Sequence, residues 1–357
     1  MKKTFLFCAA LIFCGGILSA QDYKAPENDQ FRIIGYVPSY KDISKLPDHA
    51  IERLDIACYA FASIDSTGMP VVRNEKQLKK FSKRARKLGV DVMLSFNGRH
   101  KYYADMVASP KARERFINEI WRVVKKYRLA GVDNDWEYPL GSDGSGENNL
   151  VFMKELARRC REGKKQYFLT AAITPGKYIG NATAGIPDEL FDYVDWFNVM
   201  VYDDYSEREE GRHHSTYDLM LESVGYWIGQ RGLPLKKFVV GMPAYGVPSG
   251  IMRSGNTRDY AGIIREGGSC MGDVAMISSI RNPQPYPVYY NGIKTIREKT
   301  RYAAGNNLGG IMFWEVMGDR HDDLSLIGAA CDEAVSCGAK TVPPAKTKHG
   351  KRKYSRR

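Results

Sequence analysis

The sequence predicts an α/β fold, a (β/α)8 barrel with a short insertion between its seventh and eighth strands. Short β-branched or apolar runs alternate with amphipathic stretches along the chain. Eight such runs occur within roughly 300 residues, the size of one closed parallel barrel. An open doubly wound sheet is the alternative, but a Gly-rich phosphate-binding segment would then follow the first run, and GYVPSY stands there instead.

Each predicted strand is a short apolar run between polar segments. In chain order the runs are 32–37, 54–61, 91–96, 130–136, 167–172, 195–202, 237–243 and 308–314. Helical patterns lie between them. In 110–128 apolar side chains recur every three or four residues beneath a charged face, and 217–230 shows the same spacing. Pro110 and Pro187 stand where helices tend to begin.

The spacing of the strands breaks once, between the seventh and the eighth. About 65 residues separate these two runs, more than a helix and two loops require. Because 246–290 is rich in Gly, Ser, Pro and Tyr, we expect it to form a small insertion at the carboxyl ends of the strands. With this insertion, 21–344 is expected to form a single catalytic barrel.

The two ends of the chain have their own composition. Residues 1–20 carry a short basic start, an apolar run and a small final residue, which predicts a secretory signal and an exported protein, secreted or periplasmic. A lipid anchor at Cys14 is not favoured, since bulky Phe13 stands where such sites have a small residue. No other stretch reaches the roughly 18 apolar residues of a membrane span.

Positive charge is concentrated at the ends as well. The 357 residues carry 53 Lys and Arg against 41 Asp and Glu, a net charge of +12. Two of the basic residues lie in 1–20 and seven in 345–357, which leaves 44 basic against 41 acidic residues between them. A body this close to neutral does not predict a nucleic-acid partner. We expect 345–357 to be solvated and disordered, either without a specific role or adhering loosely to anionic surfaces.

The cysteines do not predict a metal site. Beyond the signal the chain keeps Cys58, Cys160, Cys270, Cys331 and Cys337, an odd number that leaves at least one free thiol. No C-x-x-C or Cys/His pairing typical of zinc is present. We expect mainly buried, unreactive thiols with one optional bridge between Cys331 and Cys337, and no metal.

Three alternating acids make 131–139 (GVDNDWEYP) the most informative segment. On a strand, side chains two residues apart share a face, so Asp133, Asp135 and Glu137 point together, about 6–7 Å apart along the chain. In a barrel that face is the interior, and Glu137 reaches the carboxyl rim, where barrel enzymes react. Repulsion and burial raise the pKa of at least one of them, as a carboxylic general acid requires.

Two other interpretations of these acids are open. A solvated edge strand could alternate in this way, but Val132 and Trp136 indicate burial. A divalent cation needs oxygen ligands that converge on a point, whereas a straight strand spreads them out and no histidine lies nearby. A glycosidase acid with electrostatic partners fits the segment best.

This segment resembles the D-G-x-D-x-D-x-E signature of glycoside hydrolase family 18, the chitinases and their relatives. Further segments resemble motifs of that family in the same order: SFNG at 95–98, MVYD at 200–203, GMPAYG at 241–246 and GGIMFW at 309–314. Tyr36 and Phe61 stand where the first two strands of the family present aromatic residues. The resemblance covers about 31–335 and implies a glycosidase barrel that needs no cofactor.

The resemblance implies a role for each acid. Glu137 would protonate the glycosidic oxygen and later act as a base toward water, while the N-acetyl oxygen of the substrate attacks the anomeric carbon and forms an oxazolinium ion. Asp135 would orient the acetamido group and stabilise the positive ring. Asp133 would lie deeper, sharing a proton with Asp135 and bonded to Ser95.

The resemblance also implies the substrate contacts. Tyr202 would donate to the acetamido oxygen, Asp203 would contact the sugar at the cleavage site, and Trp314 would form an apolar floor beneath it. The expected binding residues are completed by Ser95, Tyr36, Phe61 and Met200. A role in the core is the alternative for the last two, and a cap on the following loop is the alternative for Asp203.

Several positions depart from the family pattern. Ala130 replaces the first Asp of the signature, and Asn97 replaces the first of two glycines. Arg99 and His100 follow, where many members have a tryptophan that stacks on the leaving-group sugar. Asn134 directs a polar side chain toward the outer helices, where apolar ones are usual. Together with the short insertion, these features predict a shallow groove suited to internal cuts or short branched glycans.

The favoured function is a secreted, endo-acting chitinase that cleaves β-1,4 bonds in N-acetylglucosamine polymers, active as a monomer. The alternative is an endo-β-N-acetylglucosaminidase that cuts the chitobiose core of N-glycans, which Arg99 and the short insertion keep open. A chitin-binding lectin on an inactive barrel is less favoured, because such relatives lose the catalytic Glu and this chain keeps Glu137. The expected partners are these glycans, without nucleic acid or a membrane span.

Overall fold

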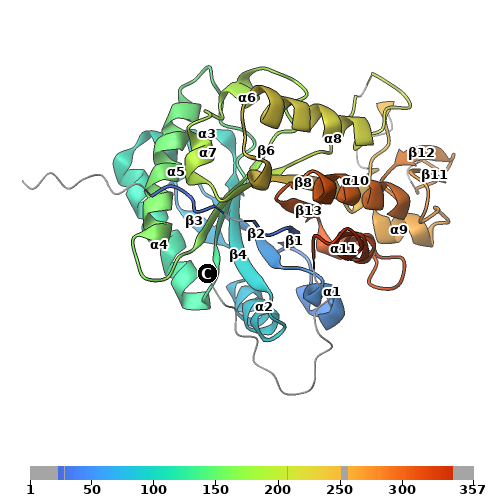
Figure 1. Cartoon of the computed structure of the whole chain (residues 1–357), viewed down its shortest axis with the longest axis horizontal. Coiled ribbons are helices and arrows are strands. Elements are labelled where there is room, and N and C mark those ends of the chain that lie inside the picture. The colour runs from blue at the N-terminus through green and yellow to red at the C-terminus, as the bar shows by residue number, and fades with distance from the viewer. Residues whose placement is uncertain (1–22, 28, 207, 251–255, 281, 341–357) are drawn as a thin grey trace, which may run out of the picture.

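A closed barrel of eight parallel strands forms the centre of the molecule (Figure 1). A computed structural model describes residues 23–340 apart from 28, 207, 251–255 and 281. The barrel strands are β1 (Arg32–Pro38), β2 (Ile56–Ile64), β4 (Asp91–Gly98), β5 (Gly131–Asn134), β6 (Phe168–Ile173), β7 (Trp196–Val199), β8 (Phe238–Pro243) and β13 (Gly310–Trp314). They lie in the order β1-β13-β8-β7-β6-β5-β4-β2, and β1 pairs with β2 to close the ring. Each predicted strand overlaps one of these eight, with differences at the ends, so the predicted barrel is confirmed.

Helices cover the outside of the barrel (Figure 1). They are α1 (Asp48–Glu52), α2 (Glu75–Lys87), α3 (His100–Ala108), α4 (Pro110–Tyr127), α5 (Ser145–Arg161), α6 (Asn181–Ala184), α7 (Leu190–Tyr193), α8 (Tyr217–Val224), α10 (Ile293–Gly305) and α11 (Leu326–Ser336), while α9 (Tyr260–Arg265) lies beside the barrel with the short strands described below. α4 begins at Pro110, where the Ser109 hydroxyl accepts the backbone N–H of Ala112. It ends where Arg128 turns left-handed, so the predicted helix 110–128 is confirmed.

The second predicted helix changes form along its length. α8 ends at Val224, and Gly225–Gln230 continues it as a π-helix, so 217–230 is helical throughout. Pro187 does not begin a helix directly: its carbonyl accepts the backbone N–H of Leu190, the first residue of α7. The proline therefore shapes the turn that leads into α7.

Between β8 and α10 the chain leaves the barrel. β9 (Tyr245–Gly246) pairs with β10 (Arg258–Asp259), and β11 (Val274–Ile277) pairs with β12 (Tyr286–Tyr289), both antiparallel. Two backbone hydrogen bonds between Val247 and Tyr289 join the two pairs. The β11–β12 pair lies to one side of the barrel in Figure 1. A further short strand, β3 (Pro70–Val72), pairs antiparallel with the end of β2.

Two apolar cores hold the fold together. The larger core lies between the strands and the surrounding helices and includes Phe96 and Trp136. The smaller core fills the barrel and includes Met93, Met200 and Met312. Because strand side chains alternate between these two cores, the strands are mostly apolar on both faces.

The thiols differ from their prediction. All five are free: Cys58 and Cys160 are buried, Cys270 and Cys331 are partly exposed, and Cys337 is exposed. The optional bridge between Cys331 and Cys337 is absent because six residues along a helix place two side chains about 120° apart around its axis. The Cys331 thiol instead donates to the carbonyl of Arg53 at 3.3 Å.

The predicted signal 1–20 and the basic segment 345–357 lie outside the described residues. Within the part of the chain that the structure describes, no helix combines the length and the apolar character needed to cross a lipid bilayer.

Candidate active site at the carboxyl end of the barrel

The carboxylate of Asp133 is the centre of a buried polar cluster inside the barrel. Its Oδ2 accepts the hydroxyls of Tyr36 and Ser95, both at 2.7 Å. Its Oδ1 accepts the Thr170 hydroxyl at 2.6 Å and the Asn198 amide at 3.2 Å. All four donors are uncharged and come from other strands. Burial raises the pKa of Asp133, although these hydrogen bonds oppose the shift.

Asp135 follows the end of β5, so the predicted strand 130–136 is too long. Its backbone N–H still donates to a β4 carbonyl at 3.0 Å, which extends the strand pairing by one residue. The alternation of side chains therefore continues. Trp136 points to the outer layer, where its ring stacks on Tyr103 with centroids 4.6 Å apart.

The Asp135 carboxyl is poorly compensated. The residue is 5% exposed, and its Oδ1 has no hydrogen-bond partner among the described residues. Burial and the charges of Glu137 and Asp133 raise the pKa of Asp135 well above its ordinary value. Asp135 and Asp133 are predicted to share a proton, but no hydrogen bond joins their carboxyl groups in the described structure. Both oxygens of Asp133 already accept hydrogen bonds from other strands.

Glu137 is the last acid of the series. It is exposed at the rim. Desolvation by the surrounding protein raises the pKa of its carboxyl and the negative charge of Asp203 raises it further, whereas a hydrogen bond with Tyr138 lowers it. The net shift is upward. A carboxylic acid that keeps its proton toward neutral pH is suited to donate that proton to a leaving group.

The segment after β7 places two predicted residues, Tyr202 and Asp203, beside the acids. β7 ends at Val199, so the predicted strand 195–202 is also too long. Met200 and Tyr202 are buried, and the charge of Asp135 is among the causes that raise the pKa of Tyr202. Asp203 has a left-handed φ of 62° and accepts the Tyr245 hydroxyl at 2.7 Å. Tyr202 and Asp203 thus flank the acids from the adjacent loop.

Three aromatic rings form one cluster at the carboxyl ends of β1, β2 and β13. The rings of Phe61 and Trp314 stack with centroids 5.5 Å apart and an interplanar angle of 17°. Both are partly exposed. Tyr36 lies 5.6 Å from the Trp314 ring but is buried, and its hydroxyl donates to Asp133. Trp314 and Phe61 can therefore offer a ring face to a ligand, whereas Tyr36, predicted to bind substrate, is placed to position Asp133.

The Ser95 hydroxyl bonds to Asp133 as predicted, whereas burial keeps both Ser95 and Met200 from the surface that a substrate would contact. Ser95 is fully buried beneath Asp133, and Met200 belongs to the core inside the barrel. For Met200 this is the alternative that the sequence left open. Both residues support the site from below.

Two of the residues that depart from the family pattern, Asn134 and His100, make specific contacts in the structure. The amide of Asn134 donates to Asn149 of α5 at 3.1 Å, and its oxygen accepts the Tyr103 hydroxyl at 3.2 Å. A polar side chain is tolerated in the outer layer because it is satisfied there. His100 contacts the carbonyl of Tyr138 at 3.0 Å and the carboxylate of Asp143 at 2.9 Å. It therefore holds the loop that follows Glu137.

Sequence reasoning missed four residues of the site. Thr170 and Asn198 donate to Asp133, Tyr245 donates to Asp203, and Tyr138 tunes the pKa of Glu137. Thr170 and Asn198 are single polar residues inside otherwise apolar strands, which is a signal that could have identified them. Tyr245 lies in the quoted GMPAYG segment but was assigned no role.

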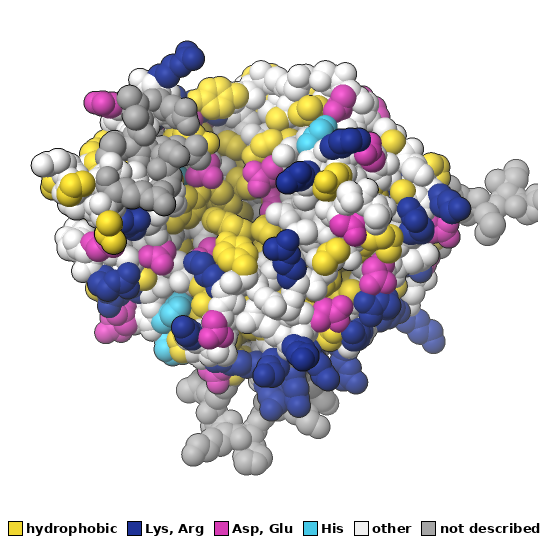
Figure 2. Space-filling view, turned by 180° about the vertical axis from the view of Figure 1, so that it is seen from behind, with side chains coloured by type: hydrophobic (Ala, Val, Ile, Leu, Met, Phe, Trp, Pro, Cys, Tyr) yellow, Lys and Arg dark blue, Asp and Glu magenta, His cyan; other side chains and the backbone are white. Residues whose placement is uncertain are grey.

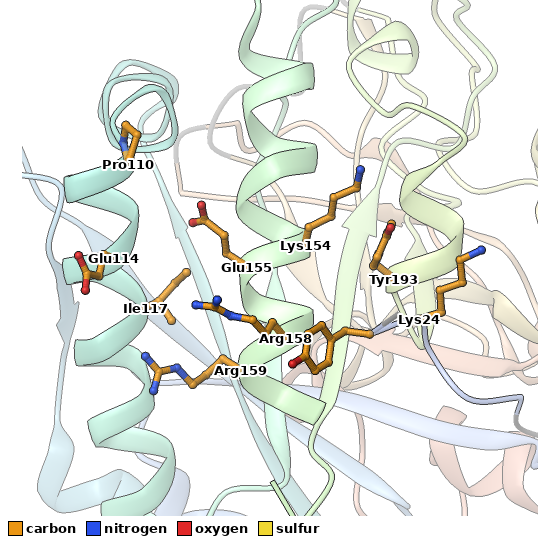
Figure 3. A pocket seen from close by; sticks show the side chains of 10 residues that line it. Lys24, Pro110, Glu114, Ile117, Lys154, Glu155, Arg158, Arg159 and Tyr193 are labelled. Carbon is orange, nitrogen blue, oxygen red and sulfur yellow. The ribbon is translucent and has the colours of Figure 1, made fainter. Parts of the chain in front are cut away.

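One face of the molecule is hollowed. Figure 2 shows a hollow lined by hydrophobic side chains, with Asp and Glu side chains beside it. A different cavity of about 750 Å³ lies between α4 and α5 on the outside of the barrel (Figure 3). Its lining includes Ile117, Arg158 and Tyr193 and none of the predicted site residues. Among the described residues no group of three or more His, Cys, Asp or Glu side chains could hold a metal ion.

Comparisons with known proteins agree with this geometry. The model of the family "Glycosyl hydrolases family 18" matches residues 32–319. A class V chitinase of Arabidopsis thaliana is 25% identical over 79% of this chain and 85% of its own length. Probable chitinase 10 of Drosophila melanogaster is 31% identical, and chitinase A1 of Niallia circulans is 24% identical. The alignments cover only 8% and 45% of those two longer proteins.

Solved structures show the same fold. A chitinase from Bacteroides thetaiotaomicron superposes with a TM-score of 0.72 at 25% identity, over 85% of this chain and 96% of that one. A chitinase from Cycas revoluta in complex with (GlcNAc)3 superposes with a TM-score of 0.70 at 22% identity, over 85% of this chain and 99% of that one.

Proposed function

Because this chain belongs to glycosyl hydrolase family 18, we propose that it is an exported, endo-acting chitinase. It cleaves β-1,4 bonds between N-acetylglucosamine units and retains the anomeric configuration. The observation that carries the proposal is the group of three acids at the carboxyl end of β5, all with raised pKa values, to which the charge of a neighbouring acid contributes at Asp135 and at Glu137. Relatives named as chitinases, and a similar structure solved with (GlcNAc)3, support this substrate class.

Glu137 supplies the proton in this mechanism. Its neutral carboxyl protonates the glycosidic oxygen as the bond to the leaving sugar breaks, and the resulting carboxylate later takes a proton from the attacking water. The upward shift of the Glu137 pKa keeps the acid form available toward neutral pH. Asp203 contributes to that shift from the neighbouring loop.

Asp135 is not suited to be the nucleophile. A carboxylate that attacks carbon must be ionised, and every cause acting on Asp135 raises its pKa. The substrate therefore supplies the nucleophile: its acetamido oxygen attacks the anomeric carbon and gives an oxazolinium ion, which water opens. Asp135, with an unpartnered oxygen, orients the acetamido group, and Tyr202 donates to its oxygen.

The rings at the other side of the site hold the sugar. Trp314 and Phe61 offer partly exposed faces, which pack well on the apolar faces of sugar rings. Asp133 and its four donors lie below the reacting centre. They fix the position of the strand end that carries Asp135 and Glu137.

A second candidate function is an endo-β-N-acetylglucosaminidase that cuts the chitobiose core of N-glycans. The observation that favours it is the pair Arg99 and His100, which replaces a stacking tryptophan on the leaving-group side. His100 is engaged with Tyr138 and Asp143, and Arg99 lies over Tyr102. This side therefore offers a cation and hydrogen-bonding groups rather than a bare ring face.

The first experiment measures release of a fluorescent aglycone from an N,N′-diacetylchitobioside by the wild-type protein and by Glu137→Gln. Because general acid catalysis contributes about 10²–10⁴-fold, we expect kcat/KM to fall by at least that factor in the variant. Exposed Glu189→Gln is the matched control and should keep full activity, and near-ultraviolet circular dichroism checks that both variants are folded.

The outcomes separate the candidates. A loss of less than about ten-fold in Glu137→Gln would refute Glu137 as the acid. If the wild-type protein releases no aglycone but trims a high-mannose glycoprotein, the second function replaces the first. If it does neither and still binds chitin oligosaccharides, the protein is a lectin. Disaccharide as the dominant early product from chitin would contradict an endo-acting enzyme with a shallow groove.

A further inference from the structure

α2 (Glu75–Lys87) concentrates positive charge. Its 13 residues, EKQLKKFSKRARK, contain seven Lys and Arg and a single acid. Residues 21–344 as a whole carry 44 basic and 41 acidic residues, so the part outside α2 has 37 against 40 and is net negative. The excess positive charge of the body therefore lies on one helix. In Figure 2, Lys and Arg side chains gather along the lower edge, at the height of α2 in Figure 1.

The cations of α2 face the solvent without carboxylate partners. The exposed ones are Lys76, Lys79, Lys80, Lys83, Arg86 and Lys87. Within the described chain no ion pair joins any of these six to an Asp or Glu, whereas Arg84 pairs with Asp48 and the single acid, Glu75, pairs with Lys126 of α4. Like charges four residues apart, such as Lys76 and Lys80, destabilise a helix. Helix stability therefore does not explain this arrangement.

A cavity of about 830 Å³ opens in this basic face, between α2 and the loop that follows β1. Lys76 and Lys80 line its α2 side, and Tyr40, 63% exposed, lines the loop side. Of the two acids in its wall, Asp42 accepts the Ser44 hydroxyl, and Glu75 is engaged by α4. Asp42 remains one exposed carboxylate against the two cations Lys76 and Lys80, so the net charge that faces a ligand is positive, and it stands opposite an aromatic ring.

The walls of this cavity are tied together. The Gln77 amide donates to the carbonyls of Ser39 and Lys41, both at 3.1 Å, and the Asn74 amide donates to Ser39 at 2.6 Å. The ammonium of Lys41 pairs with the carboxylate of Glu315, the residue after Trp314. These contacts hold the loop against α2 and place the cavity near the carboxyl rim of the barrel.

We propose that the α2 face and its cavity bind an acidic polysaccharide, one with carboxylate-bearing sugar rings, at a site separate from the catalytic acids. The ring of Tyr40 receives one sugar, and Lys76 and Lys80 pair with its carboxylate and those of its neighbours. Lys79, Lys83 and the cations beyond extend the contact along the chain. The enzyme would in this way be held on a matrix that mixes neutral and acidic glycans.

A polysaccharide fits these observations better than a lipid surface does. A membrane presents a flat array of charge and requires no cavity, and membrane-bound helices carry large apolar side chains among their cations. Large exposed apolar side chains are absent from α2. The cavity with its exposed tyrosine is the kind of site that a sugar ring fills.

The test measures binding of an alginate hexasaccharide to the full chain by calorimetry at low and at physiological salt. The variant Lys76→Gln/Lys80→Gln/Lys83→Gln removes three cations of the face. Exposed Lys111→Gln/Lys164→Gln/Lys294→Gln, which removes three cations elsewhere, is the matched control. We expect about ten-fold weaker binding in the first variant and little change in the control. Binding should weaken as salt rises.

Tyr40→Ala separates ring binding from charge attraction. We expect it to weaken binding of the hexasaccharide while leaving the net charge unchanged. If the two triple-lysine variants bind the hexasaccharide equally weakly, the net charge of the protein explains binding without a specific site, and the proposal is overturned. Tighter binding to phosphatidylglycerol vesicles than to alginate, insensitive to Tyr40→Ala, would assign the face to membranes and overturn it as well. Because binding is measured without turnover, the result does not depend on the proposed chitinase activity.

Discussion

Asp195 and Asp135 are both buried carboxylates, at opposite ends of the barrel, and they differ in the charges around them. Asp195 lies just before β7 at the amino end. Its Oδ2 accepts the guanidinium of Arg161 at 2.9 Å and the backbone N–H of Leu169 at 2.7 Å. Burial raises the pKa of Asp195, but the positive charges of Arg161, Lys237 and Arg32 oppose the shift.

Asp135 at the carboxyl end has no such compensation. Its pKa is raised by burial and by two neighbouring acids, and no cation lowers it. Asp133 beneath it is bonded only to uncharged donors. The comparison teaches how one barrel uses the same residue type in two ways. A cation makes a buried carboxylate part of the scaffold, and withholding the cation leaves a carboxyl that can exchange a proton with a substrate.

The largest expected effect comes from removing the cation at the amino end. Arg161→Met leaves Asp195 buried without its main partner, and breaking a buried pair in this way costs about 3–5 kcal/mol. We therefore expect the free energy of unfolding, measured by urea denaturation, to fall by that amount. Activity per folded molecule should be unchanged, because the pair lies far from the acids.

Exposed Arg158→Met, on the same helix, is the control for this prediction. A surface substitution changes stability by less than about 0.5 kcal/mol. If Arg161→Met proved no more destabilising than Arg158→Met, Asp195 would not depend on its cation, and the contrast between the two ends of the barrel would fail.

At the carboxyl end, a substitution at the buried acid Asp135 is expected to stabilise the protein instead of destabilising it. The folded protein binds the Asp135 proton more tightly than the unfolded chain does, so the wild-type free energy of unfolding falls as pH rises from the ordinary aspartate pKa toward the raised one. Asp135→Asn does not titrate and removes this loss. We expect a higher melting temperature for the variant, by a larger margin at pH 8 than at pH 4, together with loss of chitobioside hydrolysis.

Thermal melts of the wild-type protein and Asp135→Asn at several pH values measure this difference. Asp195→Asn is the comparison variant. It leaves the buried guanidinium of Arg161 without a charged partner and should therefore lower the melting temperature. A uniform destabilisation by both substitutions would show that the carboxyl end is not organised differently from the amino end.

The smallest expected effect concerns the pH profile of kcat/KM. The rate falls as pH rises through the Glu137 pKa, because the acid form is lost. Asp203 raises that pKa and the Tyr138 hydrogen bond lowers it. Asp203→Asn should therefore move the alkaline limb to lower pH, and Tyr138→Phe should move it to higher pH. Shifts in the same direction would contradict the assignment of Glu137 as the titrating acid.

Local patterns in the sequence determined the strands and the acids. Each barrel strand is a short apolar run, and the alternation of Asp133, Asp135 and Glu137 follows from the period of two in an extended chain. Even where β5 ends at Asn134, the alternation holds for the next residues, because the backbone of Asp135 still bonds to β4. Motif order along the chain also identified the family.

Only the closed barrel decided which groups surround each acid. Thr170 and Asn198 reach Asp133 from β6 and β7, 37 and 65 residues further along the chain. Asn134, unexplained by its own strand, is satisfied by Asn149 on α5. Periodicity is a property of neighbouring residues and can be read locally. Hydrogen-bond partners, burial and the resulting pKa shifts depend on which distant strands and helices closure brings together, and no local pattern contains that information.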